Sequence, residues 1–429
     1  MHGAPDADDQ EGTVVEIATT PPADRRFAVS LFSRLRTAKG QANPFPIYVE
    51  LRAGGGVVAA PWGGHLVTGF DLCDQVLRSR EWLEPDSRWR EQQGDGTRWT
   101  APSSRAMSRT LPALNPPDHT WVRRSAGMFD RSTLEELRGT VERITGGLLD
   151  TLAERLRDGE ADFNALVSEE LPVATIGHWL GLPAADFPRL RELTHDQVFT
   201  QELLPSASQL VLSDAATAEL REYFTALVQD RRARPGDDPV SRWIAVWDGV
   251  ESDRDKADEA VYHLALFFLL AALETTSTLL STTVLLLLEH PRQWDRLTVS
   301  PDLVPAAVEE SLRYDPPTHV ISRVASRDCV LGGTEVREDD MVHLMVGAAN
   351  RDPARHADPE LFNLHRKPGH LSFSGGIHYC LGAPLARLEA QTLLHQLVRR
   401  FPGLTLVRRP SWAPRVAFRR LLNLDVALS

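Results

Sequence analysis

Apolar residues recur with helical spacing over most of the chain between residues 117 and 289, and again at 305–314 and 382–401. This period places apolar side chains on one face of each predicted helix. In the last segment the apolar stripe is made by Leu385, Leu388, Leu393, Leu394 and Leu397. The pattern therefore predicts a chain that is helical over most of its length.

Strand patterns are confined to short segments. Residues 57–60 and 65–68 are separated by Pro-Trp-Gly-Gly, which predicts a β-hairpin, and residues 330–346 have the composition of short strands and turns. Asp71 stands where it can cap a helix that runs through Leu77. The whole pattern predicts a mainly α fold with a small β-rich lobe.

One segment, residues 260–288, is apolar over a length that could cross a bilayer. It carries Glu274 near its centre and seven Ser or Thr residues between Thr275 and Thr283. Neither a second such segment nor a flanking basic cluster accompanies it. Charged residues are rare inside membrane spans, so we predict a long helix buried in protein, and no membrane association.

Two segments lack periodicity. Residues 1–26 are polar and rich in Asp, Thr and Pro, without the apolar centre of a signal peptide, which predicts a flexible leader. Residues 79–115 carry three of the ten tryptophans, including Trp89 and Trp99, and predict a long functional loop. No linker interrupts the remainder, so we expect residues 27–429 to form a single domain.

The chain of 429 residues has a formal net charge of -12 and an isoelectric point of about 5.6. This balance gives no electrostatic support for nucleic-acid binding. The three cysteines, Cys73, Cys329 and Cys380, are too few and too scattered for a disulfide framework. A reducing, cytoplasmic location fits this usage.

The segment from Phe373 to Gly382, Phe-Ser-Gly-Gly-Ile-His-Tyr-Cys-Leu-Gly, carries the most specific chemistry. Its glycines allow a loop whose amides can point at the Cys380 sulfur, and the positive end of the following helix lies there too. Both effects favour a thiolate, which is a good axial ligand for haem iron. The alternatives are a buried structural cysteine, or a zinc site of His370, His378 and Cys380 without the usual paired spacing.

The spacing Phe-x-x-Gly-x-His-x-Cys-x-Gly resembles the haem-binding signature of cytochrome P-450 monooxygenases, and the resemblance covers nearly the whole chain. It implies the fold of that family, with haem b between the long apolar helix and the helix after the cysteine. Cys380 is then the iron ligand. Phe373, His378 and Gly382 would surround the cofactor on the same side.

Glu310-Ser-Leu-Arg313 places a carboxylate and a guanidinium three residues apart on one helix face, where they can pair. Such pairs are common by chance and are mostly solvated. Because this one precedes the cysteine in the expected order, it is similar to the Glu-x-x-Arg motif of the family. The resemblance implies a buried, structural pair that holds the irregular segment before the haem loop.

A Glu and a Thr in the middle of the apolar helix are costly unless they have partners. They could be structural, with Thr275 bonded to a carbonyl one turn earlier and Glu274 paired with a distant Arg. The stretch is also similar to the oxygen-activating motif of the family, which implies that Glu274 and Thr275 relay protons to the site of O2 reduction. Ala271 would then contact the cofactor, and Ala272 stands where the family usually has Gly.

The resemblance also implies which residues surround the cofactor and the substrate. Basic residues at family positions would bind the haem propionates through charge-assisted hydrogen bonds. These are His119, Arg123, Arg323 and His378. The substrate site on the haem face opposite the cysteine would be formed by Phe267, Leu270, Ala271 and His319, and closed by the loop with Trp89 and Trp99.

As a monooxygenase resembling soluble bacterial members, the protein would insert one oxygen atom from O2 into a small organic substrate, by hydroxylation or epoxidation of a secondary-metabolite intermediate. Electrons would come from NAD(P)H through ferredoxin reductase and ferredoxin, and we expect a monomer. The ferredoxin would dock on the cysteine side, on basic residues drawn from Arg124, Arg131, His365, Arg366, Lys367 and Arg387. Two alternatives stay open: a peroxygenase or oxidative coupling enzyme without net oxygen insertion, and a non-catalytic haem-binding or gas-sensing protein.

Overall fold

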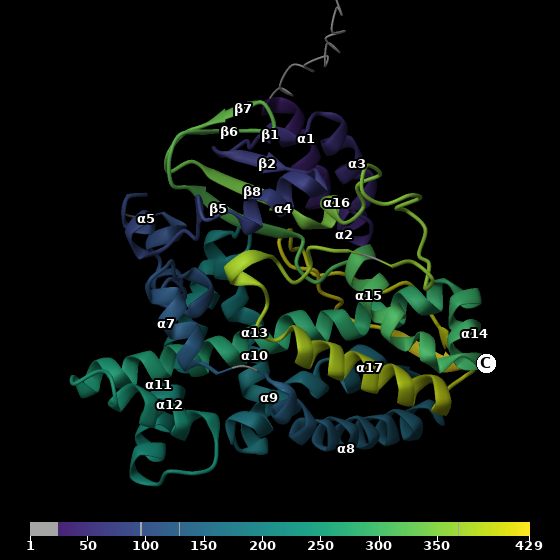
Figure 1. Cartoon of the computed structure of the whole chain (residues 1–429). Coiled ribbons are helices and arrows are strands. Elements are labelled where there is room, and N and C mark those ends of the chain that lie inside the picture. Colours follow the sequence, from purple (N-terminus) through teal and green to yellow (C-terminus); the bar gives the residue numbers. More distant parts are fainter. Residues whose placement is uncertain (1–24, 95–96, 128, 368) are drawn as a thin grey trace, which may run out of the picture.

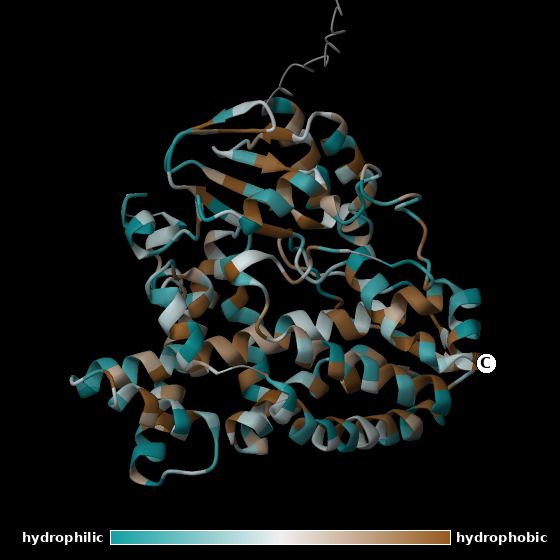
Figure 2. Ribbon diagram, in the orientation of Figure 1, coloured by the Kyte–Doolittle hydropathy of each residue, from teal (hydrophilic) through white to brown (hydrophobic). Residues whose placement is uncertain are grey.

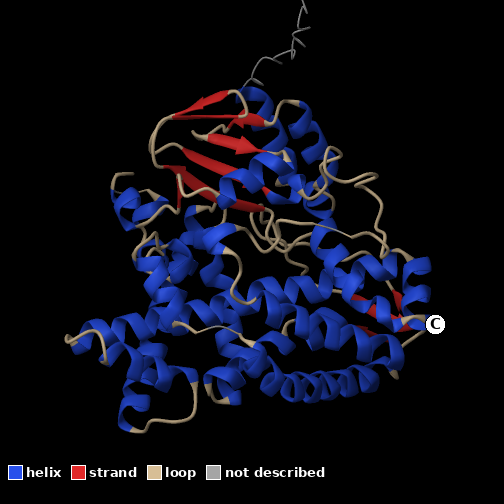
Figure 3. Ribbon diagram, viewed as in Figure 1, coloured by secondary structure: helices blue, strands red, loops and turns tan. Residues whose placement is uncertain are grey.

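The structure is a computed structural model that describes residues 25–94, 97–127, 129–367 and 369–429. A helical body carries a β-rich lobe on one side, as Figure 3 shows. The predicted mainly α fold with a small β-rich lobe is therefore confirmed. The predicted leader lies outside the described residues, except that helix α1 (Arg25–Leu35) already begins at Arg25.

A five-stranded sheet with the order β1-β2-β8-β5-β3 forms the β-rich lobe. Strands β1 and β2 are the predicted hairpin, with Val58 opposite Leu66, and β2 runs parallel to β8. Smaller sheets have the orders β4-β10-β9 and β6-β7. The strands are β1 (Val57–Ala59), β2 (His65–Val67), β3 (Trp82–Leu83), β4 (Glu160–Asp162), β5 (Val320–Ala325), β6 (Cys329–Leu331), β7 (Thr334–Val336), β8 (Met341–Met345), β9 (Leu404–Leu406) and β10 (Asp425–Leu428).

The first helices of the chain lie beside the lobe, whereas helices from the middle of the chain, together with α17, build the body (Figure 1). The segments predicted at 305–314 and 382–401 are α15 and α17, each within one residue of the expected bounds. The remaining helices are α2 (Ala38–Ala42), α3 (Phe45–Ala53), α4 (Phe70–Arg78), α5 (Ser87–Glu91), α6 (Pro102–Met107), α7 (Asp118–Ser125), α8 (Arg131–Leu156), α9 (Glu170–Leu180), α10 (Phe187–Gln197), α11 (Ala207–Ala233), α12 (Pro239–Asp248), α13 (Arg254–Glu289), α14 (Pro291–Val299), α15 (Val304–Tyr314), α16 (Val346–Ala349) and α17 (Ala383–Arg400).

Helix α13 is the long apolar helix and runs through the body. Asp253 caps its start by accepting from the N–H groups of Asp255 and Lys256. It is long and apolar enough to cross a membrane, yet 78% of its most apolar window is buried inside the protein. Figure 2 shows this apolar helix covered by its neighbours, among which α9, α11, α12 and α17 pack on it. The prediction of a helix buried in protein is confirmed.

The start of α4 differs from the expectation. Asp71 does not cap the helix, because the helix begins one residue earlier and Gly69 occupies the cap position. The carboxylate that accepts from the free Phe70 N–H, at 2.9 Å, belongs to Asp352. That residue is distant in the sequence, so the capping interaction is a tertiary contact that local pattern does not reveal.

Residues 79–115 are not one irregular loop. They contain β3, α5 and α6, with short turns of 3-10 helix at Arg98–Thr100 and Leu111–Ala113. Each element is too short to show a period of apolar residues in the sequence. The segment is therefore built on the sheet and on α11 rather than free of structure.

Candidate functional site

The cysteine loop is fixed by its own backbone and by α4. The Cys380 N–H donates to the Phe373 carbonyl at 2.9 Å, which closes the loop. Gly376 has φ of +60°, and a Cβ at this position would lie 2.5 Å from the Leu77 carbonyl oxygen. A larger residue would be strained and would collide with α4, so this glycine sets both the curl and the position of the loop.

The electrostatic surroundings of the sulfur differ from the expectation. Burial raises the pKa of the Cys380 thiol, and the N–H groups of Gly382 and Ala383, with the charges of Arg123 and Arg387, lower it only in part. The loop and the helix by themselves therefore do not favour a thiolate, because desolvation of the sulfur outweighs them. A metal cation at the sulfur would reverse this balance, since coordination removes the thiol proton.

The alternative zinc site is not formed. His370 Nε2 lies 3.2 Å from a Glu309 carboxylate oxygen, and His378 Nε2 lies 3.9 Å from Glu84. Over the part of the chain that the structure describes, no group of three His, Cys, Asp or Glu side chains is arranged to hold a metal ion. Cys380 alone suits a haem iron, which takes its equatorial ligands from the porphyrin.

The four residues expected to bind propionates come together from three segments. His119 on α7 and His378 in the cysteine loop have ring centroids 4.3 Å apart. Arg123, one turn after His119, donates to a carbonyl of the loop at 2.8 Å. Arg323 on β5 pairs with Glu84 at 2.6 Å, beside His378. The sequence positions alone could not give this proximity.

The protonation states of the cluster suit a ligand that bears carboxylates. Burial lowers the pKa of His378 to about 3 and also lowers the pKa of His119, so both rings are neutral at pH 7 and each keeps one N–H. His119 Nε2 is buried without a hydrogen-bond partner among the described residues. With the charges of Arg123 and Arg323, this donor set fits the propionates of a haem whose iron is held at Cys380.

Glu84 belongs to this cluster and was missed by sequence reasoning. Burial raises its pKa to about 7, although Arg323 and Arg90 act in the opposite direction. The residue follows β3, whose antiparallel register places Leu83 opposite Val324. Glu84 therefore stands beside Arg323 only because these two strands pair, and no motif marks it.

One face of α13 is left open by the surrounding protein. Phe267, Ala271 and Thr275 are spaced four residues apart and are each partly or fully exposed, although the helix is otherwise largely buried. Residues at this spacing share one face of a helix. The Thr275 hydroxyl donates to the Ala271 carbonyl at 2.9 Å. This is the hydrogen bond to a carbonyl one turn earlier that we expected if Thr275 has a structural role.

Glu274 points away from that face into a buried ionic cluster. Its side chain is 2% exposed and contacts Arg415 Nη1 through Oε1 and His195 Nδ1 through Oε2, the latter at 2.9 Å. Burial raises the pKa of Glu274, but Arg415 and His195 outweigh it and the net direction is downward. If Glu274 is structural, the distant arginine that was expected to pair with it is Arg415. No sequence motif marked Arg415 or His195 as its partners.

Two other residues expected at the substrate site are buried among protein side chains. Leu270 is buried in the main apolar core. His319 is 1% exposed and is held on both ring nitrogens, by the Tyr48 hydroxyl at 2.9 Å and by Asp315 at 3.0 Å. With both nitrogens occupied, His319 has the contacts of a structural residue.

Trp89 and Trp99 pack on each other with ring centroids 5.1 Å apart. The Trp89 indole N–H donates to the Asp339 carbonyl at 3.0 Å, and its ring lies in a small apolar cluster with residues of β5 and β8. The Arg98 guanidinium lies 4.1 Å from the centre of the Trp99 ring. The Trp89 contacts attach the 79–115 segment to the sheet, and Trp99 packs on Trp89 from within the same segment.

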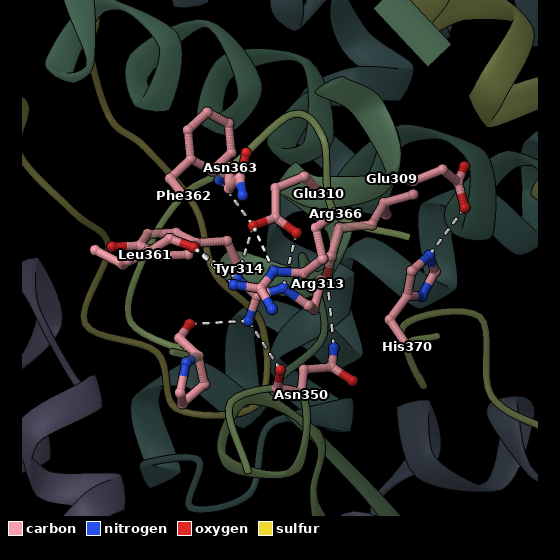
Figure 4. A network of polar contacts seen from close by, with 12 residues as sticks. Glu309, Glu310, Arg313, Tyr314, Asn350, Leu361, Phe362, Asn363, Arg366 and His370 are labelled. Carbon is pink, nitrogen blue, oxygen red and sulfur yellow. Dashed lines mark hydrogen bonds and ion pairs between the residues drawn. The ribbon is translucent and has the colours of Figure 1, made fainter. Parts of the chain in front are cut away.

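Glu310 and Arg313 form the buried pair that the resemblance implied, shown in Figure 4. Both side chains are fully buried, and Arg313 donates to both carboxylate oxygens at 2.8 Å. Arg313 also donates to the carbonyls of Asn350, Pro359 and Leu361. The pair thus fastens α15 to the irregular segment that leads to the cysteine loop.

Arg366 is part of this network rather than a surface charge. Its side chain is 14% exposed, lies 3.3 Å from Glu310 and donates to the carbonyls of Ala357 and Asp358. These contacts argue against the expected place of Arg366 in a docking surface. Of the other basic candidates, Arg387 pairs with Glu309 and Arg131 with Glu135, while Arg124, His365 and Lys367 are exposed.

Comparisons with known proteins agree with this geometry. A family model described as Cytochrome P450 matches residues 301–408, which include the Glu310–Arg313 pair and the cysteine loop. The polyketide-biosynthesis cytochrome P450 PksS of Bacillus subtilis is 34% identical over 329 residues, covering 75% of this chain and 78% of PksS. The biotin-biosynthesis cytochrome P450 of the same organism is 32% identical over 398 residues, covering 90% of this chain and 96% of the relative.

Solved structures of other proteins are also similar to this chain. The crystal structure of the BioI cytochrome P450, in complex with an acyl carrier protein that bears hexadec-9Z-enoic acid, is similar with a TM-score of 0.83 at 30% identity, covering 91% of this chain and 100% of that one. The crystal structure of CalO2 has a TM-score of 0.81 at 30% identity, covering 92% and 98%.

A long buried helix, a glycine-bent cysteine loop and a cluster of histidine and arginine side chains beside it fit a haem-binding protein of mainly helical fold. The chain belongs to the cytochrome P450 family. It is accordingly an oxidoreductase of the monooxygenase type that uses haem b and O2.

Proposed function

We propose that this protein inserts one oxygen atom from O2 into a small organic substrate, with electrons from NAD(P)H delivered through ferredoxin reductase and ferredoxin. The cluster of histidine and arginine side chains beside the cysteine loop is the observation that carries the proposal. His119, Arg123, Arg323 and His378 would hold the haem propionates, and Cys380 its iron. Haem bound there supplies O2 binding and reductive activation.

The open face of α13 supports the assignment of the substrate side. Phe267 and Ala271 lie on it, and Thr275 follows one turn later. We assign Thr275 to proton handling, because its hydroxyl is uncovered and bonds only locally to the Ala271 carbonyl. We propose that the Ala272 methyl, which stands where the family usually has glycine, narrows the groove along this face.

Relatives suggest the substrate class. They include PksS, the cytochrome P450 monooxygenase PikC of Streptomyces venezuelae and the nocardicin C N-oxygenase of Nocardia uniformis. By analogy we propose a secondary-metabolite intermediate as the substrate. We further propose that the protein acts in the cytoplasm as a monomer. The burial of α13, which is long enough to span a membrane, supports the cytoplasmic location.

The assignment of Cys380 is tested by the reduced carbon monoxide complex. A thiolate ligand gives a Soret band far to the red of that of a histidine-ligated haem, and Cys380→Ser should abolish the band. Cys73→Ser is the matched control, because the Cys73 thiol is fully buried elsewhere and bonds to the Val67 carbonyl. A red-shifted band that survives in Cys380→Ser would refute the assignment.

The reaction is tested with a surrogate ferredoxin pair, NADPH and a panel that includes myristic acid and testosterone, which bound in structures of relatives. Labelled O2 should leave one labelled oxygen atom in the product.

Thr275→Ala should keep substrate binding and haem content but divert electrons to hydrogen peroxide. Thr282→Ala, a buried position on the same helix, should not. Product formed only with added peroxide would favour the peroxygenase alternative.

A further inference from the structure

A line of titratable side chains leads from Glu274 toward the protein surface. The Glu274 carboxylate is 2% exposed, so water cannot reach it directly. Arg415 contacts one of its oxygens and the His195 Nδ1 atom contacts the other at 2.9 Å. An arginine side chain does not pass a proton on in proteins, which leaves His195 as the neighbour able to exchange one.

The other ring nitrogen of His195 faces a second carboxylate. Nε2 lies 3.7 Å from Glu169 Oε1, and it has no hydrogen-bond partner within the described ranges. The Glu169 side chain is 15% exposed and is bound by Arg420 at 2.9 Å. His195 therefore stands between an inner carboxylate that is closed to water and an outer one that is partly open to it.

The groups around His195 come from several elements and decide its protonation. Burial lowers its pKa, but the carboxylates of Glu169 and Glu274 outweigh burial and Arg420, so the net direction is upward. The imidazolium is then available near neutral pH. The charged groups that face it are Glu274 on α13, Glu169 before α9, Arg415 and Arg420 in the C-terminal segment, and Arg191 on its own helix near Glu169.

We propose that His195 is the residue that supplies protons to Glu274 during turnover. The proposal rests on the proposed function and refines it. The Nδ1 proton of the imidazolium moves to Glu274 Oε2, which leaves a neutral imidazole and a neutral carboxylic acid. The acid loses its charge attraction to Arg415 and can turn toward the Thr275 side of α13. His195 then regains one proton from water on the Glu169 side.

The test compares His195→Gln and Glu169→Gln with the control His263→Gln. His263 is also buried on a carboxylate, Glu259 at 3.1 Å, but it lies three turns from Glu274 along α13. Haem-loaded protein, a surrogate ferredoxin pair and NADPH are used with myristic acid and without it. The fraction of electrons that ends as hydrogen peroxide is measured from about pH 6 to about pH 9, a range that spans the expected titration of a histidine.

In the wild type this fraction should rise as the pH passes the pKa of His195, because the imidazolium is lost. His195→Gln should raise the fraction several-fold at low pH and flatten the profile. Glu169→Gln should move the midpoint to lower pH, since it removes a carboxylate that stabilises the imidazolium. His263→Gln should match the wild type.

A second readout does not depend on turnover. The His195 resonance, identified by its loss in His195→Gln, should titrate above the ordinary value of about 6.5 in the carbon monoxide complex. Glu274→Gln and Glu169→Gln should each lower that midpoint. An unchanged peroxide fraction and pH profile in His195→Gln would overturn the relay alone. A wild type that oxidises no NADPH would overturn the monooxygenase proposal and the relay with it.

Discussion

Replacement of Glu310 by Ala should destabilise the protein severely. Arg313 is fully buried and would keep only its three carbonyl acceptors, at 3.1, 2.9 and 3.3 Å. The Asn363 N–H, which donates to Glu310 at 3.0 Å, and Arg366 would lose their carboxylate as well. Removing one partner of a buried pair costs about 3–5 kcal/mol, because the remaining charge stays desolvated.

That cost is a large part of the roughly 5–15 kcal/mol by which native domains are stable. It would lower the folded-to-unfolded ratio by at least about two orders of magnitude. We expect little haem-loaded protein at growth temperature, and a midpoint in urea well below that of the wild type for whatever can be purified.

Glu309→Ala is the matched control, because the two glutamates are adjacent on α15. Glu309 is paired with Arg387, but the two side chains are 27% and 29% exposed. A pair of this exposure contributes about 0.2–1 kcal/mol. Equal urea midpoints and equal haem contents for Glu310→Ala and Glu309→Ala would refute the reasoning, since the network would then be open to water.

Three further outcomes are expected. Trp89→Ala should cost about 3–5 kcal/mol of stability through the cavity it leaves, and a variant as stable as the wild type with altered substrate choice would contradict this. Lys367→Glu should slow the first electron transfer in a salt-dependent way, whereas Lys39→Glu at the exposed Lys39 on α2 should not. Burial raises the pKa of Glu389 to about 8. The buried, protonated Glu389 therefore contributes fully to the free energy of unfolding below the pKa that this residue has in the unfolded chain, and the contribution is lost as pH rises toward about 8. Glu389→Gln should remove that pH dependence of the urea midpoint.

The sequence alone determined the features that depend on neighbours along the chain. Helical periodicity predicted α15 and α17 within one residue, and strand composition predicted the hairpin of β1 and β2. The cysteine loop was recognisable because its glycines, its histidine and its cysteine all lie within the ten residues from Phe373 to Gly382. The Glu310–Arg313 pair also follows from local spacing, since residues three apart on a helix face each other.

Only the tertiary structure decided which charged side chains are paired and which residues are their partners. The pairing of β3 with β5 brings Glu84 to Arg323, and the C-terminal segment brings Arg415 to Glu274. Arg366, which the sequence suggested as a surface charge, likewise forms an ion pair with Glu310 in the folded protein. Such contacts join residues far apart in the chain, and the burial of a charge, which sets its pKa and its energetic cost, exists only once the surrounding elements have packed.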